Sequence, residues 1–262
     1  MSTSIDNSGP FDRGAARRDI FEAVGRARAA GPDGKVGVAP YKLARSGDIS
    51  WTRHPRDVSD FGGSILLGPH GCAGKPRDGL VVLCGAPRTA MAVLLQTLGD
   101  QVRRRPRVLG SPIVSGIGLC AIGGDGFGLI WEPTLGGYIR FPHYGSVVFG
   151  EDVHLGDGVV INCGCLGDTV IGNGARIDSR VFIAHGAQIG EHAVLVAGCI
   201  ICGSAKIGAR AWIGPGACVL NGVAVGERGY VGAMANVLRN VPPGEVWAGN
   251  PARKIRMRRE DE

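Results

Sequence analysis

The sequence predicts a mainly β protein: a parallel β-helix of hexapeptide repeats with a small N-terminal α/β domain. Three observations lead to this fold class. Of 262 residues, 45 are Gly, aromatics are sparse (7 Phe, 4 Trp and 4 Tyr), and an aliphatic residue recurs at every sixth position of the second half. Glycine makes up only ~7% of an average protein. The absence of a Gly-X-Y period excludes collagen, and the apolar share of 44% argues against wholesale disorder.

The repeat runs from Val147 to Val237 in steps of six residues. Fifteen of the sixteen positions hold Val, Ile or Leu, and the remaining one is Cys165. A period of six fits neither a helix nor an alternating strand. It fits one short strand and one turn per hexapeptide, with three hexapeptides in a coil of about 18 residues. Gly suits the tight corners, and the stretch predicts roughly five coils without an insertion.

The N-terminal part has a different pattern. Its short apolar runs are bounded by turn residues and predict buried strands, and its two other segments have helical composition, the second ending at Gly99 as a C-terminal cap. We predict strands at 36–40, 64–68 and 79–84, and helices at 19–29 and 89–98.

Four regions follow from these patterns. We expect an N-terminal arm (1-36), a small α/β domain (37-103), the β-helix (104-241) and a basic C-terminal tail (242-262), which is either a short helix or an extended strap. A Gly-rich stretch at 118–133 interrupts the start of the β-helix. It is either a surface loop or a substrate loop, since loops on rigid scaffolds often carry function.

Charge and cysteine content narrow the function classes. The net charge of +6 suits anionic ligands. Basic runs stand at 103–107 and 253–259, and each is either a solvated face or a phosphate-binding site. Eight cysteines without a secretion signal indicate reduced thiols and a cytoplasmic protein. Cys199 and Cys202 form a CxxC without a second pair, so we expect no metal site. We expect neither a transmembrane segment nor a nucleic-acid partner.

Five strings of the chain carry a resemblance to a known family. They are SerGlyAspIleSerTrp (46–51), AlaProArgThrAlaMetAla (86–92), GlyAspGlyPheGly (124–128), LeuGlyAspThrValIleGlyAsnGlyAlaArgIleAsp (166–178) and PheIleAlaHis (182–185). In these strings and in their order, the chain from residue 39 onward resembles the UDP-3-O-acylglucosamine N-acyltransferases of lipid A synthesis. The resemblance implies a left-handed β-helix, a homotrimer, active sites between neighbouring β-helices, and a nucleotide-binding N-terminal domain that holds uridine.

The resemblance implies the catalytic residues. His185 matches the family's catalytic histidine, and neutral imidazole suits a base that takes a proton from an attacking amine. Asp178 matches the acidic partner that orients this histidine, and the two would converge across a corner of the β-helix. From spacing alone, His185 could equally be an exposed turn residue. His192 lines the same region or faces solvent.

Substrate contacts are carried over in the same way. Trp51 stands where an aromatic residue stacks on uracil, although it could also be a core residue. Where the family has Asn and Tyr after this residue, the chain has His54 and Asp57. The hydrogen-bonding groups therefore differ, and a nucleotide with a base other than uracil is an alternative. Within the Gly-rich stretch, the resemblance assigns substrate contacts to Asp125, Phe127 and Gly128.

The chain also departs from the family. Gly186 replaces an Asn after IleAlaHis, and Gly222 replaces a second histidine that assists the thioester in the family. A backbone N–H such as that of Gly203 is therefore a candidate for stabilising the developing oxyanion.

The C-terminal end resembles a different group, the coenzyme A-dependent sugar acetyltransferases. Their last coil and the segment around AsnProAla line the pantetheine channel, and nearby basic residues contact phosphate. The resemblance implies no permanently bound cofactor and acyl-CoA as the co-substrate. Carried over by position, the cofactor-binding residues are Gly232, Ala233, Arg239, Asn250, Arg253 and Lys254.

These observations together predict an acyltransferase. We expect a short acyl group to pass from acyl-CoA to the amine of a nucleotide-linked amino sugar, with His185 as general base. One alternative is the lipid A reaction itself, with a hydroxyacyl chain on acyl carrier protein. A second is a non-catalytic scaffold that binds sugar nucleotides. A third, a metal-dependent hydratase, needs three converging histidines that the spacing of His154, His185 and His192 does not supply.

Overall fold

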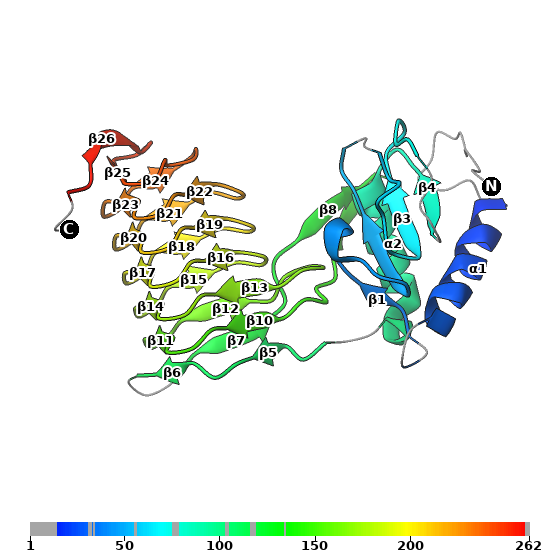
Figure 1. Cartoon of the computed structure of the whole chain (residues 1–262), viewed down its shortest axis with the longest axis horizontal. Helices are drawn as coiled ribbons and strands as arrows, with labels where there is room; N and C mark the ends of the chain where they lie inside the picture. Colours follow the sequence, from blue (N-terminus) through cyan, green and yellow to red (C-terminus); the bar gives the residue numbers. More distant parts are fainter. Residues whose placement is uncertain are drawn as a thin grey trace. The chain divides into compact units, whose positions relative to one another are not determined.

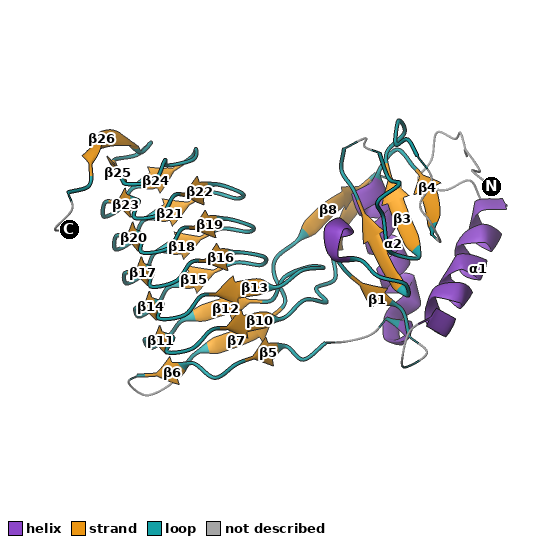
Figure 2. Cartoon of the chain, in the orientation of Figure 1, coloured by secondary structure: helices purple, strands orange, loops and turns teal. Residues whose placement is uncertain are grey.

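The computed structural model is mainly β and divides into two compact units, residues 1–104 with 127–144 and residues 105–126 with 145–262. The structure describes residues 15–30, 33, 35–54, 57–74, 79–102, 105–115, 119–133 and 135–259. Residues 1–14 of the predicted arm, Arg103 of the basic run and Gly118 of the Gly-rich stretch lie outside these ranges. Figure 1 and Figure 2 draw the elements.

The described residues of the N-terminal unit form a parallel four-stranded sheet in the order β1-β2-β3-β4, with two α-helices and two short 3-10 helices. The predicted strands and helices form, and the structure adds β2, which ends at Trp51. The elements are α1 (Ala15–Ala30), β1 (Gly37–Val38), η1 (Tyr41–Leu43), β2 (Asp48–Trp51), β3 (Ile65–Gly68), β4 (Leu80–Leu83), α2 (Pro87–Leu98) and η2 (Gly99–Gln101).

Helix α2 has clear start and stop signals and contributes to the apolar core of this unit. Pro87 stands in the first turn, where its missing N–H costs nothing, and the N–H of Gly99 closes the helix on the carbonyl of Leu95. Met91 and Leu95 are fully buried, as is Leu67 of β3. Such burial of apolar side chains provides the main driving force for folding.

A β-hairpin of β8 (Leu129–Glu132) and β9 (Gly137–Arg140) also belongs to this unit. Its strands pair antiparallel, and Trp131 and Tyr138 stack edge to face at 5.3 Å. The predicted β-helix range of 104-241 therefore needs a correction, because residues 127–144 form a hairpin instead of a coil. The Gly-rich stretch is divided between the two units at residue 127.

The second unit is a parallel β-helix, as predicted. Three parallel sheets stack successive strands side by side, visible as the layered ribbons from green to red in Figure 1. The first sheet holds β5 (Val108–Leu109), β10 (Val147–Phe149), β13 (Thr169–Ile171), β16 (Gln188–Ile189), β19 (Lys206–Ile207) and β22 (Ala224–Val225). The second holds β6 (Ile113–Val114), β11 (His154–Leu155), β14 (Arg176–Ile177), β17 (Val194–Leu195), β20 (Trp212–Ile213), β23 (Tyr230–Val231), β25 (Glu245–Ala248) and β26 (Arg253–Met257). The third holds β7 (Ala121–Gly124), β12 (Val160–Asn162), β15 (Phe182–Ile183), β18 (Ile200–Ile201), β21 (Cys218–Val219) and β24 (Asn236–Val237).

The core of the β-helix is a set of aliphatic ladders. Ile183 pairs with Ile201 and Ile201 with Val219, and all three are fully buried. The corners are tight: a Cβ on Gly190 would stand 2.5 Å from the backbone nitrogen of Ala209, a distance that real Cβ contacts do not show. The Gly excess thus has a physical cause at these corners, where two coils approach closely.

The coils are not uniform, and the prediction of coils without an insertion is wrong. Ile161 pairs with Ile183, 22 residues on, whereas Ile183 pairs with Ile201, 18 residues on. Four extra residues therefore lie in the corner between β12 and β13, at 163–168. Cys165 belongs to this corner insertion, so it is not a core position of the repeat.

The predicted tail also needs a correction. Trp247 of β25 pairs parallel with Val231, so the β-helix continues past residue 241. Strand β26 then turns back antiparallel on β25, so the basic segment is extended, as one of the two predicted alternatives had it, and is not a helix. Among the described residues, no helix has the length and apolar character that a membrane span requires.

Candidate functional site

The three polar residues singled out in the repeat lie at three different corners of the β-helix. Asp178 follows β14, His185 follows β15 and His192 follows β16. Their seven-residue spacing moves each one corner along the coil, so within this chain Asp178 and His185 lie at two successive corners. The Asp178 carboxylate instead accepts hydrogen bonds from the backbone N–H groups of Ser179 and Ala197, at 2.7 and 3.2 Å.

His185 is half-buried and packed between two coils. Its Nδ1 lies 3.8 Å from the Cys165 sulfur, and its carbonyl accepts the N–H of Ser204 at 2.9 Å. The ring lies against Gly203, where a Cβ would stand 2.8 Å from both Cε1 and Nε2. Gly203 therefore makes room for the imidazole, a role that the sequence did not reveal.

His185 starts a column of residues on one corner, each 18 residues from the last: Gly203, Asn221 and Arg239. The Asn221 side-chain nitrogen lies 3.4 Å from the point that a Cβ on Gly203 would occupy, so the amide faces the same space as the His185 ring. A Cβ on Gly222 would meet nothing within 4 Å. Sequence reasoning missed Asn221, although counting two coils on from His185 would have found it.

The corner insertion beside His185 is held by Thr169 at its end. The Thr169 hydroxyl donates to the carbonyl of Asn162 at 2.7 Å and accepts the N–H of Gly186 at 2.8 Å. Thr169 is fully buried, so these bonds are shielded from water. They tie the start of the insertion to the residue that follows His185.

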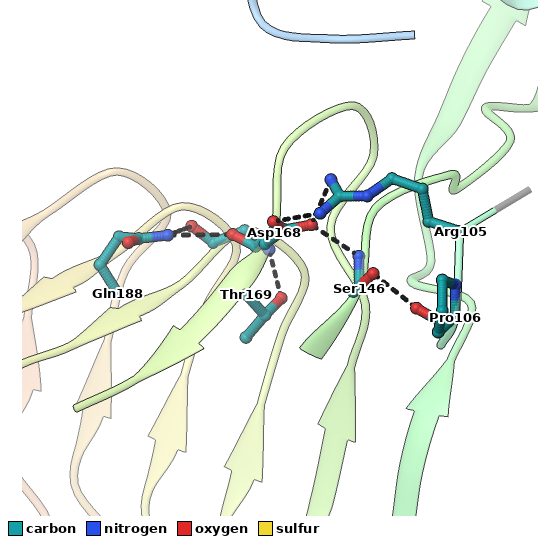
Figure 3. Close-up of polar contacts among 7 residues, drawn as sticks. Arg105, Pro106, Ser146, Asp168, Thr169 and Gln188 are labelled. Atoms are coloured by element: carbon teal, nitrogen blue, oxygen red, sulfur yellow. Dashed lines mark hydrogen bonds and ion pairs between the residues drawn. The ribbon is translucent and has the colours of Figure 1, made fainter. Parts of the chain in front are cut away.

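Asp168 anchors the insertion from the other side, as Figure 3 shows. Its carboxylate receives two bonds from the Arg105 guanidinium, at 2.9 and 3.0 Å, and the N–H of Ser146 at 2.8 Å. The Gln188 amide donates to the Asp168 carbonyl at 3.0 Å. Arg105 comes from the basic run at 103–107, so this part of the run serves internal ion pairing.

The other predicted residues of the Gly-rich stretch are divided between the two units. Asp125 belongs to the β-helix, where its carboxylate pairs with Arg107 at 2.9 Å. Phe127, with 83% of its surface exposed, and Gly128 belong to the N-terminal unit. The Gly128 carbonyl accepts the N–H of Phe141 at 2.7 Å, which aligns the hairpin.

In the N-terminal unit, Trp51 ends β2 opposite Leu67 and is half-buried. His54, three residues on, is exposed, and its carbonyl accepts the Thr52 hydroxyl at 3.1 Å. The two predicted nucleotide contacts therefore lie together just past one strand end. Asp57 forms a turn in which its carboxylate accepts the N–H of Ser59, and this bond lowers the pKa of Asp57.

The residues predicted to contact coenzyme A fall in two places. Arg239 lies on the His185 corner, after β24, whereas Gly232 and Ala233 follow β23 at a different corner. Asn250 lies beside β24, where it accepts a hydrogen bond from Asn236 at 3.2 Å. This separation leaves Arg239 as the member of the set that shares a corner with His185.

Two basic members of that set lie on β26. The Lys254 ammonium pairs with Glu245 at 2.6 Å, and the Trp247 indole donates to the same carboxylate at 2.8 Å. The hydrogen bond from Lys254 is the main cause that lowers the pKa of Glu245. Lys254 is thus already engaged by an anion, while the Arg253 guanidinium donates to the Ala252 carbonyl at 2.9 Å.

The repeats around His185 are also similar to those of known proteins. Residues 168–203 match the family model described as bacterial transferase hexapeptide (six repeats). This segment includes Thr169, Asp178, His185 and Gly203, so the match covers the corner around His185.

Curated relatives are similar over about a third of the chain. The chain is 50% identical over 78 residues to a UDP-3-O-acylglucosamine N-acyltransferase of Coxiella burnetii, covering 30% of this chain and 22% of the relative. It is 48% identical over 81 residues to the protein of that name in Chromohalobacter salexigens, covering 31% and 22%. The matched part of the chain thus spans about a fifth of the length of these relatives.

A solved structure supports the fold alone. The UDP-N-acetylglucosamine O-acyltransferase of Moraxella catarrhalis is 16% identical, with a TM-score of 0.52 over 86% of this chain and 74% of that one. At this level of identity the similarity concerns the arrangement of the elements and carries no information about substrates.

Proposed function

We propose that this protein transfers an acyl group from a thioester to the amine of a nucleotide-linked amino sugar, with His185 as general base. One observation carries the proposal: His185 lies within residues 168–203, which match the bacterial transferase hexapeptide model, and its half-buried ring lies between Cys165 and Gly203. An imidazole held in one orientation at the surface of a rigid scaffold suits proton transfer.

The proposed reaction is a direct attack. The amine nitrogen bonds to the thioester carbonyl carbon while His185 takes the amine proton, and the carbon–sulfur bond then breaks. The leaving thiolate receives the proton from the imidazolium. The carbonyl oxygen becomes negative on the way, and fixed donors stabilise such an oxyanion. The Gly203 N–H and the Asn221 amide, on the same corner, are the donors that we propose.

The similarity to named relatives favours one acceptor over the others. Because those relatives are UDP-3-O-acylglucosamine N-acyltransferases, UDP-3-O-acylglucosamine is the first acceptor to test. We propose that the donor is a phosphopantetheine thioester, carried either by acyl carrier protein or by coenzyme A. The exposed Arg239, on the His185 corner, supports a donor with a phosphate.

We also propose a homotrimer in which neighbouring β-helices cover an apolar strip beside this corner. Ile200, Leu220 and Leu238 are 41, 42 and 45% exposed, and such adjacent apolar residues often mark an interface. Trp51 and His54 are the proposed nucleotide contacts of the N-terminal unit. Light scattering that gives a monomer mass at micromolar concentration would overturn the trimer.

The direct test is thiol release by His185→Gln. We expect kcat to fall by about 10²-fold or more, the usual contribution of a general base. Wild type and variant are assayed with hydroxyacyl carrier protein and short acyl-CoAs against UDP- and dTDP-linked amino sugars. His154→Gln, on strand β11 of a different sheet and paired with Asp152, is the matched control and keeps wild-type turnover.

The two donors give different results in this assay. Turnover only with carrier protein supports the lipid A type of reaction, and turnover with acyl-CoA supports the acetyltransferase type. The proposal fails if the wild type releases no thiol with any amino sugar, which is the result expected of a scaffold. It also fails if His185→Gln retains full activity.

A further inference from the structure

Two cysteine thiols of successive coils lie next to each other on the outside of the third sheet. Cys202 follows β18 and Cys218 begins β21, and their sulfur atoms are 4.0 Å apart. Ile201 and Val219, beside them in the two strands, are fully buried, so the two cysteines point outward. Both cysteines are half-buried. The β-helix therefore presents a partly accessible pair of thiols on its surface.

The hydrogen bonds of the sheet fix the backbone of both cysteines. The Cys202 N–H donates to the Val219 carbonyl at 3.0 Å, and the Cys218 N–H donates to the Ala235 carbonyl at 2.8 Å. Because Cys218 pairs with Ile200, Cys202 is its diagonal neighbour. Diagonal neighbours stand about 7–8 Å apart, and a disulfide does not form across more than about 7 Å unless the backbone moves. The geometry therefore favours two thiols over a disulfide.

The spacing of the two sulfur atoms fits a single thiophilic ion. A metal–thiolate bond of about 2.3 Å puts two sulfur atoms on one ion about 3.8–4.6 Å apart, from a tetrahedral to a linear angle at the metal. The observed separation of 4.0 Å lies within this range. An ion can therefore enter between the two thiols with little movement of the fixed backbone.

The donor set narrows the choice of ion. Among the described residues, no further His, Cys, Asp or Glu joins the pair to form a group of three. Cys199, the other member of the CxxC, is fully buried in the core of the β-helix. A structural zinc ion takes four protein ligands, whereas the soft ion Cu(I) binds thiolates and is stable with two of them. The pair therefore favours Cu(I) over zinc.

The charge state of the thiols suits a metal ligand better than a nucleophile. Burial, and to a lesser extent the neighbouring Cys218, raises the pKa of Cys202 to about 11. The Cys202 thiol is therefore protonated at neutral pH and is a poor nucleophile. An ion with a high affinity for sulfur displaces this proton when it binds.

We propose that Cys202 and Cys218 form a binding site for a thiophilic monovalent cation, Cu(I). Two copper–sulfur bonds form, both thiol protons pass to solvent, and neither copper nor sulfur changes its oxidation state. The bound ion joins two successive coils of the third sheet. The site does not depend on the proposed function, because none of its steps involves an acyl group or a sugar.

The experiment measures Cu(I) retention by the full chain against a competing Cu(I) chelator, bicinchoninate, under reducing conditions. Ile200 and Leu220 lie on the same outer face, 41 and 42% exposed, and the proposed trimer would enclose the thiol pair together with them. Cu(I) is therefore supplied in two ways, to the purified protein and during refolding from urea. We expect the wild type to retain the ion after at least one of the two treatments.

Single substitutions locate the ion. We expect Cys202→Ser and Cys218→Ser each to bind it at least about tenfold more weakly than the wild type, since even an outer-shell partner of a metal contributes that much to affinity. The matched control is Cys120→Ser. Cys120 is half-buried in the same unit, and its thiol donates to the Gly156 carbonyl. This control variant should retain the ion as the wild type does.

A second measurement needs no variant. X-ray absorption of the copper-loaded wild type reports the donor atoms, and we expect two sulfur neighbours and no nitrogen neighbour.

Three outcomes overturn the site. One is a wild type that retains no Cu(I) after either treatment, which leaves the pair as a thiol–thiol hydrogen bond. Another is equal retention by the wild type, Cys202→Ser and Cys218→Ser. The third is a nitrogen neighbour in the absorption spectrum together with loss of the ion in Cys165→Ser, because the Cys165 sulfur lies 3.8 Å from His185 Nδ1 and the ion would then belong to that corner.

Discussion

The close contact between His185 and Gly203 allows a substitution that moves the ring of the proposed base without removing it. In Gly203→Ala, the new methyl would stand 2.8 Å from His185 Cε1 and Nε2, whereas ordinary contacts begin at 3.4 Å. The ring must therefore retreat by about 0.6 Å, and the Cys165 sulfur on its Nδ1 side limits where it can go. A misplacement of about 1 Å costs roughly 10²-fold in rate, so we expect kcat to fall by at least about tenfold.

The assay separates displacement from unfolding. Gly203 is absent from the residues with positive φ, so its backbone accepts an alanine. Thiol release and thermal melting are measured for Gly203→Ala and for Gly85→Ala, whose added methyl would meet nothing within 4 Å. We expect both variants to melt close to the wild type and only Gly203→Ala to lose activity. Full activity in Gly203→Ala would refute the claim that the two coils fix the ring.

Two further predictions concern the corner insertion and the C-terminal hairpin. Thr169→Val keeps the shape of the side chain but removes the hydroxyl that bonds the Asn162 carbonyl and the Gly186 N–H. The free energy of unfolding in urea should therefore fall by about 2–3 kcal/mol. The exposed Thr97→Val is the control, and an equal loss in both variants would contradict the role of the insertion. At β25–β26, the lowered pKa of Glu245 means that its pairing with Lys254 stabilises the folded protein at neutral pH and is lost as the pH falls through the folded-state pKa. The melting temperature of the wild type should therefore decline on acidification more than that of Lys254→Met, and parallel curves would argue against this coupling.

The fold was predictable because one property, an aliphatic residue every six positions, determines both the strands and their stacking. The corner insertion was not, for a physical reason. Each hexapeptide of the β-helix buries two positions, such as Val159 and Ile161, both fully buried. Four extra residues shift the phase of the repeat from one buried position to the other, so the series stays apolar through the insertion. Cys165, the one position of the series without Val, Ile or Leu, lies within the insertion.

The site was predictable only in part, for a related reason. The resemblance identified His185 by its neighbours in the sequence, but a site on a β-helix is assembled from residues one coil apart. Gly203 was proposed for its N–H, and the structure adds that its missing side chain accommodates the imidazole. Cys165 comes from the preceding coil and has no periodic relation to His185, so no count along the sequence would have placed it there.

The column of residues at this corner also changes what the glycine at 222 means. Compared by residue type, Gly222 marks a lost histidine and argues against catalysis. Compared by coil, the residue two coils above His185 is Asn221, and its amide faces the space over Gly203. A side-chain N–H held there can donate to a developing oxyanion as a histidine would, without carrying a charge. Under the proposed function, Asn221 would thus supply at this corner the polar group that Gly222 lacks.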